Sequence, residues 1–271
     1  MERLRAEIDG YLSGMGVEYY AVLDYRDVRE ARPDIIGRED FLPRSVIIYL
    51  LPYYVDTPVN ISRYAASLDY HIALGEINGG LIEVIGRHLP EAHLRGYGDH
   101  SPIDERHAAL ISGLGILGQN GLLINEKYGS YIFIGDLVTD IDPDLLGATP
   151  PKNIERCHGC GICLASCPTG ILRGEGEGCL SAITQRKGEL SDDEVELMRK
   201  FNTVWGCDEC QRHCPYNSDP IVTPIEFFHR ERIECLTSEL LATLGKEDFR
   251  RRAFGWRGRR VVERNLEKLG Y

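Results

Sequence analysis

The hydrophobic pattern of the first half of the chain predicts helices mixed with strands. Residues 2–14 have the spacing of an amphipathic helix, and residues 66–88 have that of a long helix in which Gly79-Gly80 is a candidate interruption. The segment 45–51 is apolar at every position after Ser45, so it is expected to be a strand buried on both faces. A further helix is predicted near 103–112. The other predicted strands lie at 17–23, around Leu94, at 122–124 and at 131–134.

The second half of the chain carries all nine cysteines, and its first run has the spacing of a cluster-binding motif. Cys157-His-Gly-Cys160-Gly-Ile-Cys163-Leu-Ala-Ser-Cys167-Pro168 reads C-x2-C-x2-C-x3-C-P, the run with which bacterial ferredoxins bind iron–sulfur clusters. The two-residue gaps let the chain curl around one corner of a cubane. Gly159 and Gly161 permit the positive backbone angles that such a curl needs.

A shorter run, Cys207-Asp-Glu-Cys210-Gln-Arg-His-Cys214-Pro215, lacks one cysteine of the four, and the isolated Cys179 is the natural supplement. Together the two runs and Cys179 provide eight thiols, enough for two four-cysteine clusters. In two-cluster ferredoxins the cysteine before proline binds the other cluster. By that crossover one cluster would take Cys157, Cys160, Cys163 and Cys214, and the second would take Cys167, Cys179, Cys207 and Cys210.

Three other uses of the cysteines explain the pattern less well. Disulfides are rare where cytosolic thiols stay reduced, and nothing in the sequence indicates export. Structural zinc also uses C-x2-C pairs, but it does not account for two Cys-Pro endings or for the three-plus-one arrangement. Unpaired buried thiols would explain one cysteine, and that role, a small core residue, is expected for Cys235.

These segments predict an α+β fold in three parts. Residues 1–150 are expected to form a mixed α/β domain. Pro143, Pro150 and Pro151 mark a linker into a ferredoxin-like double 4Fe–4S module over 151–222. A helix at 192–201 belongs to that module, and a helical segment over 223–271 completes the chain.

Composition indicates a cytoplasmic protein with no membrane partner. The chain is 43% hydrophobic and 27% charged, ordinary values for a soluble protein. Its first residues contain neither an apolar signal region nor an adjacent pair of arginines. The longest apolar run, 46–55, is interrupted by Pro52 and is too short to span a bilayer.

The net charge of −11 disfavours unspecific nucleic-acid binding, but the charge is unevenly spread. Seven arginines crowd the C-terminal end, and they are expected to help hold an RNA. The alternative is a solvated helix face that balances an acidic body. These arginines are Arg250, Arg251, Arg252, Arg257, Arg259, Arg260 and Arg264.

Two short motifs are partial matches to cofactor-binding signatures. The stretch 113–118 matches G-x-G-x-x-G, and Asp136 stands at about the distance of a ribose-binding acid. A helix is predicted before these glycines and a strand after them, the reverse of a nicotinamide site. Asp69-Tyr-His71 with Gly75 is close to a cobalamin signature, but the glycine is one residue late. We expect His71 to be a packed, hydrogen-bonded core histidine.

Several longer motifs occur in a specific order, and together they carry a family resemblance. They are Ile61-Ser-Arg-Tyr-Ala65 with Asp69-Tyr-His71, Asp99-His-Ser-Pro102 with Glu105-Arg106, Gly113-Leu-Gly-Ile-Leu-Gly-Gln-Asn120, Tyr128-Gly-Ser-Tyr131, Cys179-Leu-Ser-Ala-Ile-Thr184, and the run from Cys207 to Asn217. From about residue 44 onward the chain resembles the epoxyqueuosine reductases, cobalamin-dependent iron–sulfur enzymes of tRNA queuosine synthesis. Ile116, Gln119 and Tyr216 depart from that family's motifs. The chain also stops at Tyr271, where many members continue into a helical-repeat tail that helps to hold tRNA.

The resemblance implies an oxidoreductase that converts epoxyqueuosine to queuosine in tRNA with cobalamin and two 4Fe–4S clusters. It also implies that residues 1–150 form the domain for cobalamin and substrate. Its partners would be the anticodon stem-loop of a tRNA and an external low-potential electron donor. The alternatives are a cobalamin-dependent reductase of another substrate, related in design to reductive dehalogenases, and a non-catalytic electron carrier that has lost cobalamin.

The resemblance also implies roles for single residues. Asp99 stands where the family places its proton donor, and such an acid needs apolar burial to raise its pKa. A solvent-exposed turn residue or the N-cap of the following helix is the alternative for Asp99. By position, Ser62, Arg63, Leu123 and Ser181 resemble cobalamin-contacting residues.

Overall fold

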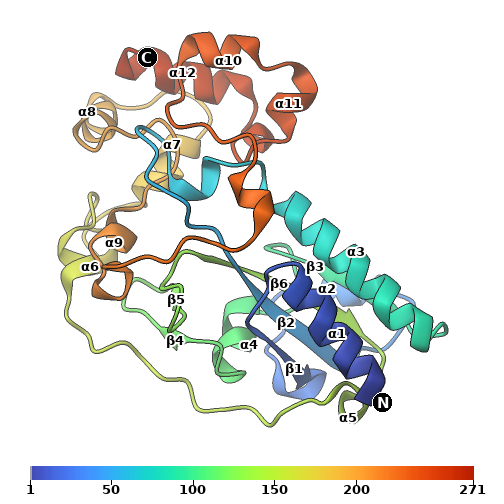
Figure 1. Cartoon of the computed structure of the whole chain (residues 1–271). Helices are drawn as coiled ribbons and strands as arrows, with labels where there is room; N and C mark the ends of the chain where they lie inside the picture. Colours follow the sequence, from blue (N-terminus) through green and yellow to red (C-terminus); the bar gives the residue numbers. More distant parts are fainter. Residues whose placement is uncertain (1) are drawn as a thin grey trace. The chain divides into compact units, whose positions relative to one another are not determined.

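The computed structural model describes residues 2–271, which form two compact units (Figure 1). The first unit comprises the chain up to Pro52 together with His71–Gly159, and the second comprises Tyr53–Tyr70 together with Cys160–Tyr271. The chain therefore leaves the first unit after Pro52, returns at His71 and leaves again after Gly159. The functional division predicted at residues 150 and 222 stays a prediction.

The first unit is built on a four-stranded antiparallel sheet with strand order β1-β2-β6-β3. In the central pair, Ser45 stands opposite Thr139 and Pro52 opposite Ile132. Helices and an antiparallel sheet in one unit confirm the predicted α+β class. The four strands are β1 (Tyr20–Asp24), β2 (Ser45–Pro52), β3 (Leu94–Tyr97) and β6 (Ile132–Thr139).

Strand β2 is buried along its whole length, as its unbroken apolar run predicted. Side chains alternate across a strand, so Val46, Ile48 and Leu50 face one side and pack with helix α4 (Glu105–Ile111). On the other side, Tyr49 donates a 3.0 Å hydrogen bond to Asn78 of helix α3 (Tyr70–His88). Both faces of the sheet are therefore covered.

Helix α1 (Glu2–Gly14) lies beside α3 (Figure 1), and a glycine makes this approach possible. The Tyr11 hydroxyl donates to the carbonyls of Glu76 and Ile77 at 3.2 Å. A Cβ at Gly80 would lie 2.1 Å from that hydroxyl, whereas one at Gly79 would meet nothing within 4 Å. The glycine pair does not interrupt α3, and Gly80 leaves room for Tyr11.

The glycine-rich stretch 113–118 follows α4 and leads into a hairpin of β4 (Ile116–Leu117) and β5 (Leu123–Ile124). The order is therefore helix, glycines, strand, as expected, and not the order of a nicotinamide site. The hairpin also positions the start of the cysteine region. The N–H of Leu117 donates to the carbonyl of Glu155 at 2.8 Å, and the N–H of Cys157 donates to that of Leu117 at 3.0 Å.

Several boundaries differ from those predicted. Strand β1 begins at Tyr20 rather than residue 17, α3 begins at Tyr70 rather than residue 66, and β6 continues to Thr139. The predicted linker starts with a short helix, α5 (Pro143–Leu146), because Asp142 caps it and proline suits a first helical position. The hydrophobic pattern gave no sign of another short helix, α2 (Pro33–Ile36).

The second unit consists of short helices, which are α6 (Ile162–Ala165), α7 (Leu180–Gln185), α8 (Asp192–Lys200), α9 (Glu209–Arg212), α10 (Ser238–Thr243), α11 (Lys246–Arg250) and α12 (Arg259–Leu269). Helix α8 confirms the helix predicted at 192–201, and Ser191 and Glu194 form a capping box at its start. Helices α10 to α12 confirm the predicted C-terminal helical segment. Among residues 2–271, no helix combines the length and the apolar character that crossing a membrane requires.

The core of the second unit joins its two segments. Trp205 is fully buried beside Phe254 and donates from its indole nitrogen to the Tyr64 hydroxyl at 2.9 Å. Asn60, 1% exposed, exchanges two 2.8 Å hydrogen bonds with the backbone of Leu236. Residues 53–70 are therefore an integral part of this unit.

Candidate iron–sulfur and catalytic site

The first cysteine run forms a loop around the short helix α6. Gly159 and Gly161 have φ angles of 72° and 75°, as the cubane-binding curl predicted. Cys163 and Cys167 are buried, and the other two cysteines of the run, Cys157 and Cys160, are partly or fully exposed. Glycine adopts such angles without strain, so the backbone suits a loop that wraps around an inorganic cluster.

The second run and the isolated cysteine flank two further short helices. Cys210 lies on α9, with Cys207 before it and Cys214 after it. Cys179 is exposed and occupies the N-cap position of α7. Cys235, predicted to be a core residue, is instead partly exposed in the segment before α10. Its exposure sets it apart from a packed core thiol, and it belongs to neither run.

Among residues 2–271 no cysteine forms a disulfide, so none of the eight candidate ligands is lost in that way. Burial raises the pKa of Cys167, but hydrogen bonds from the backbone of Leu172, Thr169 and Gly170 and from the Thr169 hydroxyl outweigh it and lower that pKa. Backbone N–H groups directed at a cysteine sulfur are typical of sites that hold a thiolate.

The eight thiols fit clusters better than a single metal ion. Within residues 2–271, no three His, Cys, Asp or Glu side chains converge on one ion-sized point. A 4Fe–4S cubane takes its thiolates at four separate corners, whereas structural zinc gathers four ligands around one atom. Cysteines outside disulfides, on loops with left-handed glycines, suit the cubane.

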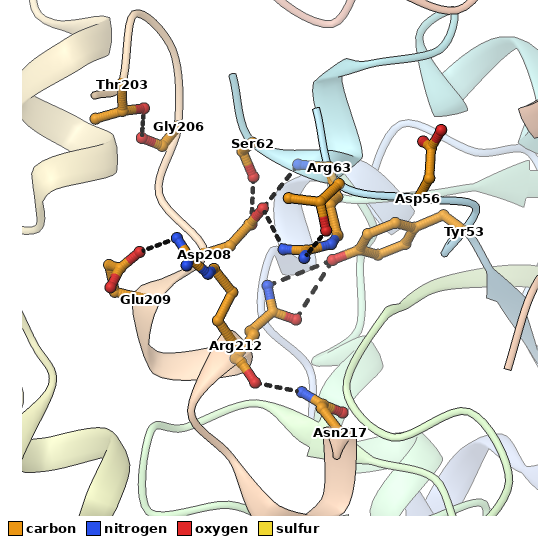
Figure 2. A network of polar contacts seen from close by, with 12 residues as sticks. Tyr53, Asp56, Ser62, Arg63, Thr203, Gly206, Asp208, Glu209, Arg212 and Asn217 are labelled. Carbon is orange, nitrogen blue, oxygen red and sulfur yellow. Dashed lines mark hydrogen bonds and ion pairs between the residues drawn. The ribbon is translucent and has the colours of Figure 1, made fainter. Parts of the chain in front are cut away.

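A buried polar network lies next to the second run (Figure 2). The Asp208 carboxylate accepts from the backbone N–H of Arg63 at 2.8 Å, from the Arg63 guanidinium at 3.4 Å and from the Ser62 hydroxyl. The side chains of Arg63 and Asp208 are only 8% and 7% exposed. Asp208 directly follows Cys207, so this ion pair fixes the backbone beside a candidate cluster ligand.

Gly206 brings the two halves of this network together. A Cβ at Gly206 would lie 2.4 Å from the Cβ of Ser62, so only glycine allows this approach. The Thr203 hydroxyl donates to the Gly206 carbonyl at 2.9 Å (Figure 2). An open cleft of about 390 Å³ borders the network, with Ser62, Arg63 and Cys207 among its lining residues.

The four predicted cobalamin contacts fall into two groups. Ser62 and Arg63 belong to the buried network, and Ser181 lies on α7. Gln185 links Ser181 to Tyr64 by donating to both hydroxyls, at 3.0 and 3.3 Å. Leu123 belongs to the first unit, where it is buried in the core beneath the sheet.

Asp99 lies on an exposed turn, so it lacks the apolar burial that was expected of a general acid. Its φ of 61° is unusual for a residue other than glycine. The N–H of Asp99 donates to the Glu105 carboxylate at 2.7 Å, and the Arg32 guanidinium donates to the carbonyls of Asp99 and Ser101 at 3.2 and 3.3 Å. The N-cap of α4 is Asp104, which excludes that alternative for Asp99.

Burial is found instead at Asp136, which is fully buried, and at its half-buried neighbour Glu105; sequence reasoning did not identify the two as an acid pair. Burial and the Asp136 carboxylate together raise the pKa of Glu105 well above its usual range. Burial also raises the pKa of Asp136, and the Ser101 hydroxyl, which donates to it at 3.0 Å, opposes that rise. Two neighbouring carboxyls cannot both ionise cheaply in a dry site, so the pair holds a proton near neutral pH.

The sequence contained one sign of this pair. Asp136 interrupts an apolar strand, and it is fully buried within β6. A charged residue in such a strand needs a partner. His71, by contrast, was predicted to be a core residue and is exposed at the start of α3.

The C-terminal arginines are not one free basic face. Arg259 donates to the carbonyls of Leu241 and Leu244 at 2.6 and 2.5 Å, and Arg264 donates to that of Arg186 at 2.8 Å. These guanidiniums close helix ends and loops of the second unit. Arg259 and Arg264 are therefore engaged in the fold, and the expectation that the arginine-rich C-terminus helps to hold RNA stays a prediction.

The cysteine loops and the fold together define a double-cluster iron–sulfur protein. A family model described as "4Fe-4S double cluster binding domain" matches residues 156–217, which include both runs and Cys179. The epoxyqueuosine reductase of Leadbetterella byssophila is 33% identical over 75% of this chain and 71% of its own length. The chain belongs to the epoxyqueuosine reductase family.

A second relative agrees with this membership, and a solved structure shares the fold. The epoxyqueuosine reductase of Listeria monocytogenes is 32% identical over 86% of this chain and 64% of its own length. A crystal structure of epoxyqueuosine reductase with an epoxyqueuosine-modified tRNA-Tyr stem loop has the same fold, with a TM-score of 0.77, 21% identity, and 99% of this chain and 81% of that one covered. This chain thus spans somewhat less than two thirds of the Listeria relative. The two cofactors predicted from the sequence, paired 4Fe–4S clusters and cobalamin, fit this family.

Proposed function

We propose that this chain reduces epoxyqueuosine to queuosine in tRNA. The observation that carries the proposal is the double-cluster region at 156–217 in a chain of this family. Reducing an epoxide to an alkene releases its oxygen as water and consumes two electrons and two protons. The protein therefore needs an electron path and a proton source, and its cysteine loops and buried carboxyl pair offer side chains for both.

In this proposal two 4Fe–4S clusters carry the electrons from an external low-potential donor. The lack of disulfides among residues 2–271, the left-handed glycines and the N–H groups around Cys167 support this assignment. Cys157, Cys160, Cys163 and Cys214 hold one cluster, and Cys167, Cys179, Cys207 and Cys210 hold the other.

Cobalamin contacts are proposed at Ser62, Arg63, Ser181 and Leu123. The cleft beside the Ser62–Arg63–Asp208 network supports the first two, because its polar lining suits the amide and phosphate groups on the periphery of a corrinoid. When bound, cobalamin supplies a strongly reducing cobalt centre for the two-electron chemistry. The role of the protein is to position the corrinoid and to exclude water around it.

Asp99 is proposed as the proton donor to the departing oxygen, which leaves poorly as an alkoxide. Its carboxyl is exposed, but its backbone is held by Glu105 and Arg32. Glu105 is a positioning residue in this scheme, because it accepts the Asp99 N–H bond and shares a proton with Asp136. The buried pair thereby keeps the turn in place and holds a proton near it.

The substrate in this proposal is the anticodon stem-loop of a tRNA. The solved relative bound to a modified tRNA stem loop supports this substrate class. With its net charge of −11, the chain repels phosphates at long range, so a confined basic surface has to provide the attraction.

A turnover assay tests the proposal. Protein with reconstituted clusters and cobalamin is incubated anaerobically with a strong reductant and epoxyqueuosine-containing tRNA, and queuosine formation is measured. Asp99→Asn should retain both cofactors and slow turnover by about a hundredfold or more. No turnover despite bound cobalamin would indicate a reductase of another substrate. Failure to bind cobalamin at all would indicate an electron carrier.

A further inference from the structure

The second unit contains an open basic pocket around the turn between α11 and α12. It has a volume of about 1130 Å³, and no acidic side chain is among its lining residues. We call it the Trp256 pocket. Its lining consists of Lys187, Lys246, Phe249, Arg250, Gly255, Trp256, Arg257, Gly258 and Arg259.

Four cations of this pocket are available to a ligand. Lys187, Lys246, Arg250 and Arg257 form no ion pair with any residue in 2–271, unlike Arg251, which pairs with Glu231. The buried Nε of Arg257 also lacks a hydrogen-bond partner within the same residues. Arg259 is excluded, because its guanidinium is occupied by backbone carbonyls.

Trp256 adds an aromatic face to these charges. Its side chain is 62% exposed, whereas Trp205, the other tryptophan of the chain, is fully buried. The Arg257 guanidinium lies over the indole at 3.9 Å, a cation–π contact that covers one face of the ring. Exposing a tryptophan costs free energy. The face of the Trp256 ring that Arg257 leaves uncovered therefore indicates a planar ligand.

The backbone holds Trp256 in this position. Trp256 and Arg257 sit on a single 3-10 turn between two glycines. A Cβ at Gly255 would lie 2.3 Å from the carbonyl oxygen of Phe249, so the turn packs tightly against α11. Gly258 has a φ of 93° and starts α12 with no side-chain cap. The aromatic ring therefore stands on a short, braced loop.

We propose that the Trp256 pocket binds single-stranded RNA, with a base stacked on Trp256 and phosphates held by Lys187, Lys246, Arg250 and Arg257. Stacking platforms combined with cations are the usual means of binding unpaired nucleotides. The proposal rests on the function proposed above, and it assigns to this loop the task of gripping an unpaired part of the tRNA. Base stacking, as well as charge, then contributes to the affinity for RNA.

Other occupants fit the pocket less well. An anionic membrane would require a broader apolar patch, and Trp256 is the only large exposed apolar side chain that lines this pocket. An acidic protein would satisfy the cations but would give no specific role to an exposed ring beside them. A nucleic acid uses both features at once.

The two tryptophans allow a direct test by fluorescence. Adding an anticodon stem-loop RNA to the cluster-loaded protein should quench the Trp256 emission, while the buried Trp205 stays unchanged. Trp256→Phe should remove this signal yet bind labelled RNA almost as tightly, because phenylalanine still stacks. Trp256→Leu should weaken binding by about tenfold or more. Equal RNA affinity for Trp256→Leu and the parent would overturn the stacking role.

The charges are tested with a matched pair of triple variants. Changing Lys246, Arg250 and Arg257 together to glutamine should lower RNA affinity and flatten its salt dependence by about one unit for each phosphate that no longer meets a cation. The control changes three exposed arginines outside the pocket, Arg3, Arg26 and Arg38, and alters the net charge equally. Equal reductions of affinity in the two triple variants would mean that overall charge, and not this pocket, attracts the RNA.

The outcomes separate this inference from the proposed function. A parent protein that binds RNA through Trp256 but never forms queuosine supports the pocket and rejects the reaction. A parent that forms queuosine in tRNA while Trp256→Leu has an unchanged KM rejects the pocket and leaves the reaction standing. Quenching by anionic vesicles but not by RNA would overturn the pocket proposal in favour of a membrane surface.

Discussion

The backbone N–H of Asp99 donates a 2.7 Å hydrogen bond to the carboxyl of Glu105, six residues further along the chain. Asp99 has a positive φ, so its conformation needs support from its surroundings. Glu105 in turn shares a buried site with Asp136, and the pair holds a proton. The position of the proposed proton donor is therefore linked to the protonation of a neighbouring pair of acids.

Glu105→Gln should separate positioning from titration. The amide oxygen of glutamine can still accept the Asp99 N–H, and its NH2 group can donate to Asp136, but it carries no titratable proton. Turnover of the parent should fall as pH rises through about 9, the raised pKa of Glu105, whereas Glu105→Gln should stay nearly level there. The pH–rate profiles of both proteins, measured with saturating tRNA, check this.

The control for that experiment is Glu105→Ala, which has no acceptor for the Asp99 N–H. It should lose up to about a hundredfold in kcat at every pH, since a displaced catalytic group costs that much. Other groups near the pair, namely Asp99, Tyr25, Tyr49 and Tyr97, remain in all variants. Parallel profiles for the parent and Glu105→Gln would contradict the link between the titration of Glu105 and turnover, and an unchanged kcat in Glu105→Ala would contradict the positioning role.

The same carboxyl should make stability depend on pH. The pKa of Glu105 is raised in the folded state by burial, so its contribution is fully present below its unfolded pKa of about 4.5 and is lost as pH rises toward about 9. Glu105→Gln has no such loss. The free energy of unfolding of the variant, relative to the parent, should therefore rise between pH 5 and pH 9. Urea titrations at several pH values measure this; a constant difference would show that Glu105 titrates normally.

Iron analysis tests the ligand assignment. Reconstituted parent protein should contain about eight irons and eight sulfides, as two cubanes require. Cys179→Ala should damage one cluster, whereas Cys235→Ala, which changes a partly exposed thiol outside both runs, should leave the iron content unchanged. A parent protein that contains zinc and no sulfide would contradict the cluster assignment.

Asp208→Asn should destabilise the second unit strongly. It removes the carboxylate charge that pairs with the buried Arg63 guanidinium. Removing one partner of a buried ion pair costs about 3–5 kcal/mol. Asp219→Asn is the matched control, because Asp219 is exposed and forms no ion pair with another residue in 2–271. Thermal unfolding followed by circular dichroism should show a large drop for the first variant only. Similar midpoints for both would mean that the ion pair is energetically neutral.

Two adjacent glycines in α3 should respond in opposite ways. Gly79→Ala should stabilise the protein by about 0.5–1 kcal/mol through helix propensity, since its Cβ meets nothing within 4 Å. Gly80→Ala should lose that gain, because its Cβ displaces the Tyr11 ring and the two hydrogen bonds of its hydroxyl. Denaturant unfolding compares the two. In a Tyr11→Ala background the variants should become equal, and a persistent difference would point to another cause.

The sequence predicted best those features that depend on neighbouring residues. The apolar run at 45–51 indicated a strand covered on both faces, and cysteine spacing with Gly159 and Gly161 predicted the backbone of the first loop. These signals are local, since a strand or a cluster loop is specified by its own short segment. They were sufficient for the α+β class and for the two-cluster region.

Features formed by distant residues could not be predicted. Glu105 and Asp136 become a pair only because α4 packs on β6. The sequence indicates that Asp136 needs a partner, but it does not indicate that Glu105 is that partner. The carbonyls that Arg259 binds lie 15 and 18 residues away, on and just after another helix. Charge in a sequence says nothing about whether a guanidinium is free. The boundaries of β6 were also missed, because Gly135 and Asp136 interrupt its apolar pattern although the strand continues to Thr139.

Asn60 has a consequence for how the protein is made. Its side chain and backbone bond to Leu236 and Val204, residues that leave the ribosome long after it does. The first unit can fold once Gly159 has emerged. Asn60, by contrast, has to wait until its partners Val204 and Leu236 have been synthesised, and Leu236 lies 176 residues after it. Such long-range pairing is slow to form. All nine cysteines are therefore synthesised before the second unit can close around them.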